Sequence, residues 1–259
     1  DLILEGRVVI ITNGVPYDLI APGLFFDYLA SPEDLNLKYQ FSNFFKFLRF
    51  IGLLVSVLLP GLYMAIATIH VEFIPTELLL VIIGSRESVP FPIFFEILIM
   101  EVSLELIREA GVRVPTPLGQ TIGIVGALVL GQAAVDASIV SPILIIIVAF
   151  TGIASFTIPD FSLGLYSRLT RFFYIILGYF LGLVGIGVGI FINAVVICSM
   201  KSFGVSYLAP LLPNTGNQSH FGIFLIPAWK RESRDAFLAT KKEKKEKHIS
   251  MEWKFPKKA

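Results

Sequence analysis

The sequence predicts a mainly α-helical, multi-pass membrane protein of four to six spans that carries the remnant of an N-terminal α/β soluble domain. Hydrophobic residues make up 55% of the 259 residues and charged residues only 16%, whereas soluble domains carry about 25% charged residues. The apolar residues are concentrated in a few long runs, which indicates lipid contact rather than an unusually large core. The net charge of +1 gives no indication of nucleic-acid binding.

Three regions follow from this distribution of residues. Residues 1–43 read as the C-terminal end of a soluble domain, 44–213 as a helical membrane domain, and 214–259 as a polar, basic cytoplasmic tail. The first residues lie inside a strand-like run, so we expect the chain to be a fragment whose N-terminal part is missing. The sequence alone leaves open whether the chain is a complete functional product.

A β-hairpin and short helices are predicted in the N-terminal region. Residues 7–12 are rich in β-branched side chains, Asn13-Gly14 is a type I′ turn signal, and residues 15–20 could return as the partner strand. A helix start is predicted at residues 31–34, where Ser-Pro-Glu-Asp places acidic residues in the first turn.

The first predicted span covers residues 50–69, which are long enough to cross roughly 30 Å of hydrocarbon. Lys38, Lys46 and Arg49 precede it, which favours a cytoplasmic N-terminal side. Pro60-Gly61 lies in the middle of this run and is expected to kink the helix.

Residues 71–117 are ambiguous, because 78–83 are too few to span alone; the alternatives are a re-entrant segment and a tilted helix. A helix over 93–110 follows, opened by Pro92 and closed by Gly111. Whether this region adds two spans is left open.

The clearer spans come later in the sequence. A tight helical hairpin is predicted over residues 118–137 and 139–158. A soluble loop containing Pro159-Asp160 and Arg168 follows it. A long, tilted span is then predicted over residues 172–200. With the basic tail also on the cytoplasmic side, the number of crossings must be even, and both termini are expected in the cytoplasm.

Small residues recur every three or four positions in two of the spans. Such stripes let helix backbones approach closely in lipid, so ordinary helix packing is the expected role and a sliding, gating surface is the functional alternative. The residues are Gly119, Gly123, Ala127 and Gly131 in the first stripe, and Gly178, Gly182, Gly185 and Gly189 in the second.

Charged residues are unusually dense on the predicted helix 93–110. At 100° per residue, Glu101, Glu105, Arg108 and Glu109 share an arc of roughly 100°, while Glu96 lies on the other side. An ionised acid at mid-bilayer costs about 2.5–3.5 kcal/mol, so these acids must face protein, water or the interface. In a ring-shaped oligomer they would line a cation pathway. The alternatives are an interfacial amphipathic helix, or a Glu105–Arg108 pair that only neutralises itself.

Other chemistry finds no support in the sequence. The three histidines lack metal-ligand spacing, the glycines lack the context of a nucleotide loop, and no serine has a histidine in a known motif. We therefore expect no enzyme activity, no metal and no cofactor. Gln132 and Asp136 lie four residues apart, which favours a hydrogen-bonded hairpin corner over an ion site.

Several longer motifs, taken in order, resemble one family: the A subunit of GerA-type nutrient germination receptors. The resemblance runs from about Glu5 to Pro213. It is carried by TELL at 76–79, SRESVPFP at 85–92, ELIREAGVRVP at 105–115, GQ at 119–120, IVGALVLGQAA at 124–134, VSP at 140–142, IPDFSL at 158–163, RLTRF at 168–172 and SFGV at 202–205.

This resemblance implies a protein of the spore inner membrane that acts with a transporter-like B subunit and a C lipoprotein. It further implies a homo-oligomer that forms a nutrient-gated channel for monovalent cations. The large N-terminal region of the family is missing apart from the hairpin at residues 5–20, and the tail after Pro213 diverges. The alternatives are a non-conducting scaffold for the nutrient-binding subunit and the related sporulation-stage A-like channel component. A secondary transporter would predict inverted repeats, and no convincing repeat is found.

Overall fold

The computed structural model describes residues 3, 6–14, 19–113, 126, 129–212 and 238, except for the side chains of residues 35, 112 and 113. The chain divides into two compact units, residues 1–50 with 192–259, and residues 51–191. These boundaries fall inside two long helices, whereas the sequence suggests boundaries near residues 43 and 213. Each unit is described by itself below.

The first unit contains two short β-hairpins. Strand β1 (Val8–Ile10) pairs antiparallel with β2 (Leu19–Ala21), with Val8 opposite Ala21. The pair occupies the segment where the sequence predicts a hairpin, although most of the expected partner strand, residues 15–18, lies outside the described residues. Gly14 has a positive φ of 86°, which a residue without a Cβ adopts without strain.

The second hairpin joins β3 (Lys201–Ser202) to β4 (Val205–Ser206). It binds the segment that follows β2, because the Gly23 amide donates to Ser202 Oγ at 3.1 Å. The Phe25 amide, in the 3₁₀ turn η1 (Phe25–Asp27), donates to the Tyr207 carbonyl at 3.0 Å. These contacts explain why residues 201–207 belong to the same unit as the N-terminal elements.

Helix α1 (Tyr39–Thr68) begins eleven residues before the predicted span and continues through Pro60. Polar side chains in the first turns of α1 face inward, since Ser42 and Lys46 are buried. Arg49 forms an ion pair of 2.5 Å with Asp34, which lies in the 3₁₀ turn η2 (Pro32–Leu35). Two of the basic residues expected at the membrane surface therefore face protein. The outward positions of these turns are aromatic: Phe41, Phe44, Phe45 and Phe47.

Two helices in the described part of the chain, α1 and α6 (Phe161–Ser199), are long and apolar enough to cross a membrane. The expected four to six spans are therefore not confirmed. Helix α5 (Pro142–Phe156) has 15 residues, or about 23 Å, which is short of the roughly 30 Å hydrocarbon layer. Most of the other arm of the predicted hairpin, 118–125 and 127–128, lies outside the described residues.

Helix α6 differs from the prediction at both ends. The expected soluble loop around Arg168 is helical, because α6 begins at Phe161, directly after Asp160. Asp160 caps this end: its Oδ1 accepts a hydrogen bond from the Leu163 amide at 2.9 Å. A carboxylate that satisfies a free amide in the first turn stabilises a helix start. The sequence predicts a loop at Pro159-Asp160, whereas the pair marks a helix N-terminus.

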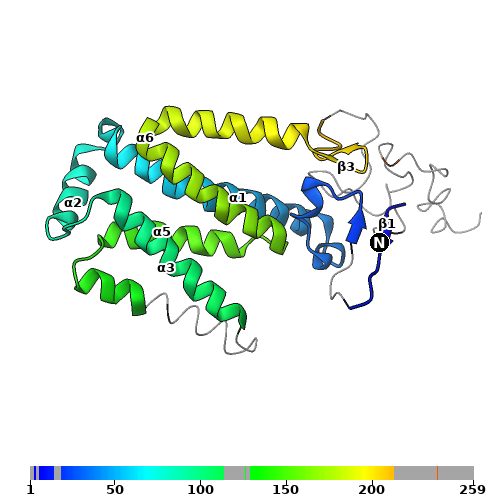
Figure 1. Cartoon of the computed structure of the whole chain (residues 1–259), viewed down its shortest axis with the longest axis horizontal. Coiled ribbons are helices and arrows are strands. Elements are labelled where there is room, and N and C mark those ends of the chain that lie inside the picture. Colours follow the sequence, from blue (N-terminus) through cyan, green and yellow to red (C-terminus); the bar gives the residue numbers. More distant parts are fainter. Residues whose placement is uncertain are drawn as a thin grey trace, which may run out of the picture. The chain divides into compact units, whose positions relative to one another are not determined.

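Helix α6 also turns back on itself at Gly182, whose φ of 60° and ψ of −141° are non-helical. A methyl group built at Gly189 would lie 2.7 Å from the Tyr174 ring. The two residues are fifteen positions apart, about 22 Å along a straight helix. Helix α6 is thus two packed arms rather than one tilted span, as Figure 1 shows.

Glycines set the distance between α1 and the first arm of α6. A methyl group built at Gly178 would lie 2.5 Å from the Gly61 carbonyl oxygen, and one at Gly61 would lie 2.8 Å from the Tyr174 carbonyl oxygen. The two backbones therefore touch directly, which is the kind of contact expected of small-residue stripes in lipid. Gly61 therefore allows α1 and α6 to approach each other closely, whereas the sequence predicts only a helix kink at this residue.

The remaining elements of the second unit are η3 (Val71–Phe73), α2 (Thr76–Arg86), α3 (Ile93–Arg113) and α5. Residues 129–136 are helical and lead through a turn into α5. Gln132 Nε2 donates to Asp136 Oδ1 at 3.0 Å, which confirms the predicted hydrogen-bonded corner. The apolar core draws on α1, α3, α5 and α6 and contains Met64, Ile97, Met100, Leu144, Val148 and Ile175.

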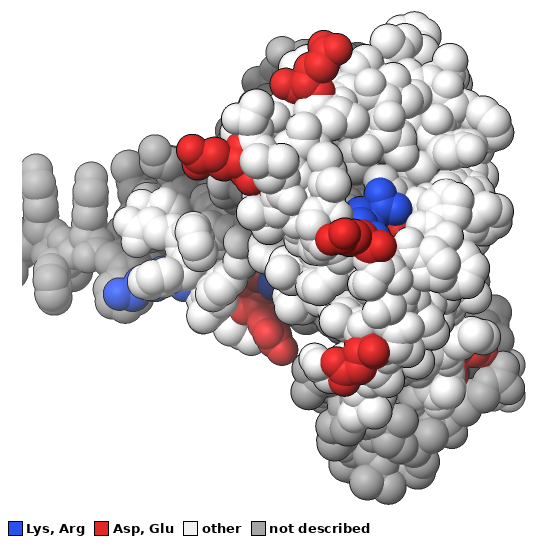
Figure 2. All heavy atoms as spheres, turned by 90° about the vertical axis from the view of Figure 1, so that its left-hand side faces the viewer, with Lys and Arg blue, Asp and Glu red and all other residues white. Residues whose placement is uncertain are grey.

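The second unit buries several polar side chains beside its apolar core and exposes many large apolar ones. Ser56, Thr151 and Ser167 are completely buried, while Phe150, Phe180 and many other large apolar side chains are exposed. Figure 2 shows one face of the molecule, on which uncharged residues cover most of the described surface. Exposed apolar surface of this extent is typical of lipid or protein contact, and it supports a membrane association.

Adding one methyl group at the α1–α6 contact should destabilise the second unit. We expect Gly178→Ala to lower the free energy of unfolding by about 1–3 kcal/mol, because the backbones must separate to admit the side chain. The effect is measured as the midpoint of thermal unfolding in detergent, monitored by the loss of monodisperse protein. Gly187→Ala is the matched control, since a methyl group there meets no atom within 4 Å. Equal midpoints for both variants would contradict the close contact.

Candidate functional site

Helix α3 carries the acidic residues that the sequence singles out. It covers Ile93–Arg113 and so includes the whole predicted helix 93–110. Glu96 and Glu101 are buried, Glu105 is partly exposed, and Glu109 is exposed near the C-terminal end of the helix. The buried acids matter most, because an ionised group inside a protein needs a partner to offset its loss of hydration.

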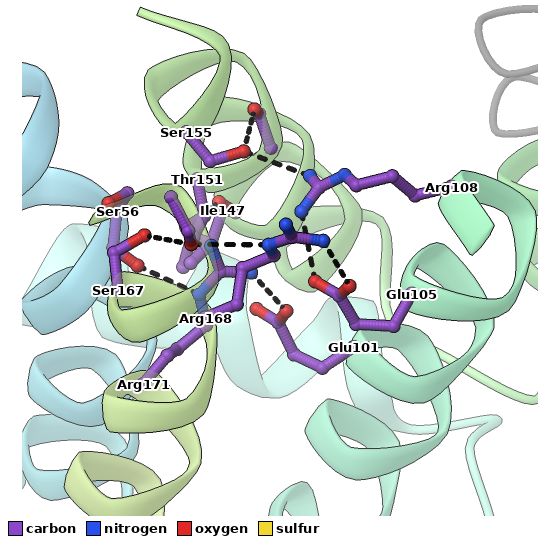
Figure 3. A network of polar contacts seen from close by, with 12 residues as sticks. Ser56, Glu101, Glu105, Arg108, Ile147, Thr151, Ser155, Ser167, Arg168 and Arg171 are labelled. Atoms are coloured by element: carbon purple, nitrogen blue, oxygen red, sulfur yellow. Dashed lines mark hydrogen bonds and ion pairs between the residues drawn. The ribbon is translucent and has the colours of Figure 1, made fainter. Parts of the chain in front are cut away.

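Glu101 forms a buried ion pair with Arg171 of α6. Arg171 Nη1 lies 2.5 Å from Glu101 Oε2, and the two side chains are 1% and 0% exposed. Arg171 Nε also donates to the Ser56 carbonyl oxygen at 2.8 Å. One guanidinium therefore links α3, α6 and α1, as Figure 3 shows.

Glu105, one turn further along α3, binds two arginines. Arg108 Nη1 lies 2.9 Å from Glu105 Oε1, and Arg168 Nη1 of α6 lies 3.2 Å from Oε2. Arg108 also donates to Ser155 Oγ of α5 at 2.9 Å (Figure 3). The self-neutralising Glu105–Arg108 pair that the sequence analysis considered is therefore present, but Arg168 and Ser155 extend it to two other helices.

The central ion pair is incompletely bonded. Glu101 Oε1 and Arg171 Nη2 are both buried, and neither has a hydrogen-bond partner among the described residues. Buried polar atoms without partners cost about 1–3 kcal/mol each and call for an explanation. This site thus combines full burial with unused bonding capacity.

Glu96 forms a second, separate polar centre on the other side of α3, as its predicted position implies. Its Oε1 accepts from Arg86 Nη2 of α2 at 2.7 Å, and its Oε2 accepts from the Ser141 amide at 3.1 Å. Ser141 is the N-cap of α5, and its hydroxyl accepts from the Leu144 amide. Glu96 therefore joins α2 to the start of α5.

The glycines of the predicted stripes have different roles. Gly178 contacts α1, Gly182 forms the turn within α6, and Gly185 and Gly189 pack against the first arm of the same helix. Gly131 is in ordinary contact with Ile145. Gly119, Gly123 and Ala127 lie outside the described residues.

The arginine partners were missed in the sequence analysis. The sequence places Arg168 in a predicted loop and gives Arg171 no structural role, so it identifies neither residue as a counter-ion. Their spacing of three residues places both on one face of a helix, and this signal could have identified them. The carbonyl of Ser56 has no sequence signature.

The network offers charge but no evident reaction chemistry. In the described part of the chain, no three His, Cys, Asp or Glu side chains group together so as to hold a metal ion. What the arrangement provides is a set of carboxylates held between apolar helices, each within reach of an arginine.

Comparisons with known proteins identify relatives of this chain. The family described as "Bacillus/Clostridium GerA spore germination protein" matches residues 1–237. Spore germination protein KA of Bacillus subtilis is 46% identical over 90% of the chain and 43% of its own length. Spore germination protein GerLA of Bacillus cereus is 39% identical over 92% of the chain and 48% of its own length. The B. subtilis protein named "Uncharacterized membrane protein YfkQ" is 44% identical over 82% of the chain and 41% of its own length.

The chain thus spans less than half the length of these relatives. No solved structure matches it.

Removing the Glu96 carboxylate should destabilise the second unit strongly. We expect Glu96→Ala to cost about 3 kcal/mol, because Arg86 and the Ser141 amide lose a buried acceptor. Glu87→Ala, at an exposed residue nearby, should change stability by less than about 0.5 kcal/mol. Thermal unfolding in detergent compares the two variants, and an equal effect would show that Glu96 is not a structural centre.

Proposed function

The chain belongs to the GerA family of spore germination proteins, and on this premise we propose that it forms the membrane part of the A subunit of a nutrient germinant receptor. In this proposal the A subunit is an oligomeric channel that conducts monovalent cations when the nutrient signal arrives. Its role in spore germination follows from the family, and conduction is the further step proposed here.

The single observation that carries the channel proposal is the row of acids on α3 between apolar helices. An ionised side chain inside a bilayer is costly, at about 2.5–3.5 kcal/mol, and usually marks a functional site. Glu101, Glu105 and Glu109 follow one another at one-turn intervals, about 6 Å apart along α3. In a ring of subunits these positions would give stacked carboxylate rings, which attract cations and exclude anions.

The proposed setting is the spore inner membrane, with four to six spans and both termini in the cytoplasm. Helices α1 and α6 support the membrane location by their length and composition. The proposed partners are further copies of this chain, a transporter-like B subunit that recognises the nutrient, and a C lipoprotein. Membrane lipid would cover the exposed apolar residues of the second unit.

The glycine contacts are proposed to pack the helices that move on gating. The α1 and α6 backbones meet directly at Gly61 and Gly178, so these two helices would move together. Gly182 is the turn about which the two arms of α6 would reorient. The stripe of Gly119, Gly123, Ala127 and Gly131 is proposed to serve the same purpose in the predicted span 118–137.

A non-conducting scaffold is the second candidate, and one observation favours it. Glu101 and Glu105 are both bound to arginines, so the network can join helices mechanically without ever meeting a free ion. Such a scaffold would hold the nutrient-binding subunit and transmit its conformational change.

Neutralising single carboxylates separates the two candidates. We expect Glu101→Gln and Glu105→Gln each to reduce the preference for cations over anions in nutrient-stimulated flux, because each removes one ring of negative charge. Flux is measured in liposomes that contain the A subunit assembled with its partner subunits.

Glu87→Gln, which removes an exposed acid outside α3, should leave flux and selectivity unchanged. Normal selectivity in both α3 variants would overturn the assignment of the pore to this helix. Absence of stimulated flux from the correctly assembled wild-type receptor would favour the scaffold.

A further inference from the structure

We infer that Arg171 is the counter-ion that keeps Glu101 from cations in the resting protein, and that Glu101 meets a cation only after this ion pair separates. The inference rests on the proposed channel function and adds to it the group that controls the carboxylate. Arg171 is therefore a positioning residue, and Glu101 is the group that would contact the ion.

The closeness of the pair is the first argument. With Arg171 Nη1 at 2.5 Å from Glu101 Oε2, a cation approaching the carboxylate would meet the positive guanidinium at nearly the same distance. The attraction and the repulsion then largely cancel, since both fall with distance in the same way. In the conformation of this structure Glu101 cannot serve as a cation-attracting group.

The bonding pattern of the pair is the second argument. Arg7 and Asp27 in the first unit form a two-point pair, in which Nη1 and Nη2 each bind one carboxylate oxygen. Such bidentate pairs combine strength with fixed geometry. Arg171 and Glu101 are joined at one point only, and Arg171 Nη2 and Glu101 Oε1 stay without partners in the described structure. A pair of this kind loses less on separation than a two-point pair would.

The attachments of the two residues are the third argument. Arg171 is held to α1 through the Ser56 carbonyl, and α1 touches the same arm of α6 at Gly61 and Gly178. Glu101 belongs to α3, which binds α5 through Arg108 and Ser155. A shift of α1 and α6 against α3 and α5 would separate Arg171 from Glu101, and also Arg168 from Glu105.

Arg168 is a weaker candidate for the same role. Its partner Glu105 is 26% exposed and also binds Arg108, so losing Arg168 leaves that carboxylate paired and partly exposed. Neutralising Arg168 should therefore have a smaller effect than neutralising Arg171, and this comparison separates a specific counter-ion from a general loss of positive charge.

The test measures monovalent cation flux at about pH 8 through the assembled receptor, without nutrient and then with it. Arg171→Gln keeps a side-chain amide that can still donate to Ser56. We expect it to raise flux without nutrient by about tenfold, because the closed arrangement is left with an unpaired, buried Glu101 carboxylate and the closed–open equilibrium shifts. Arg168→Gln should give a smaller rise, and Lys201→Gln, at an exposed residue of the first unit, none.

The double variant Glu101→Gln/Arg171→Gln gives the decisive reading. It lacks both charges, so flux without nutrient should return to the wild-type level while the preference for cations under nutrient falls. The inference is overturned if Arg171→Gln assembles with wild-type flux, or if the double variant leaks as much as the single one.

If Arg171→Gln alone does not assemble, the double variant decides the question: reduced cation preference supports the inference, and wild-type preference refutes it. A wild-type receptor that assembles but never conducts would refute the proposed function itself, which is a different outcome from normal conduction that ignores Arg171.

Discussion

The buried ion pair between Glu101 and Arg171 is the interaction on which the second unit depends. Both side chains are removed from solvent, so each is tolerated only because the other is present. The guanidinium also binds the Ser56 carbonyl, which brings a third helix into the contact. Much of the arrangement of α1, α3 and α6 can be understood as the geometry that keeps these two charges together.

The glycine contacts make that geometry possible. Arg171 Nε reaches the backbone of α1 because α6 lies against α1 without intervening side chains at Gly61 and Gly178. The turn at Gly182 then folds the second arm of α6 back onto the first. Glycine and arginine therefore act together: the small residues bring the backbones close, and the charged residue binds across the contact.

The same network is compatible with conduction and with mechanical coupling, and the difference lies in whether its ion pairs exchange partners. Glu105 shares two arginines and is partly exposed, so its pairing resembles an ordinary network near a surface. Within the described residues, Glu101 has one partner and unused hydrogen-bonding capacity. A channel would use this difference, because Glu101 can be freed by the loss of a single partner. A scaffold would need no such difference between Glu101 and Glu105.

The sequence by itself determined the helical class, the acidic helix over residues 93–110, the Gln132–Asp136 corner and the family. These features depend on local periodicity, short-range spacing and motif order, all of which a linear sequence contains. Only the tertiary structure decided that Glu101 faces Arg171, that Glu105 binds Arg168, and that α6 turns back at Gly182. Those outcomes depend on which helices lie side by side, since a buried charge is placed by a partner 70 positions away, and no local pattern specifies such a partner.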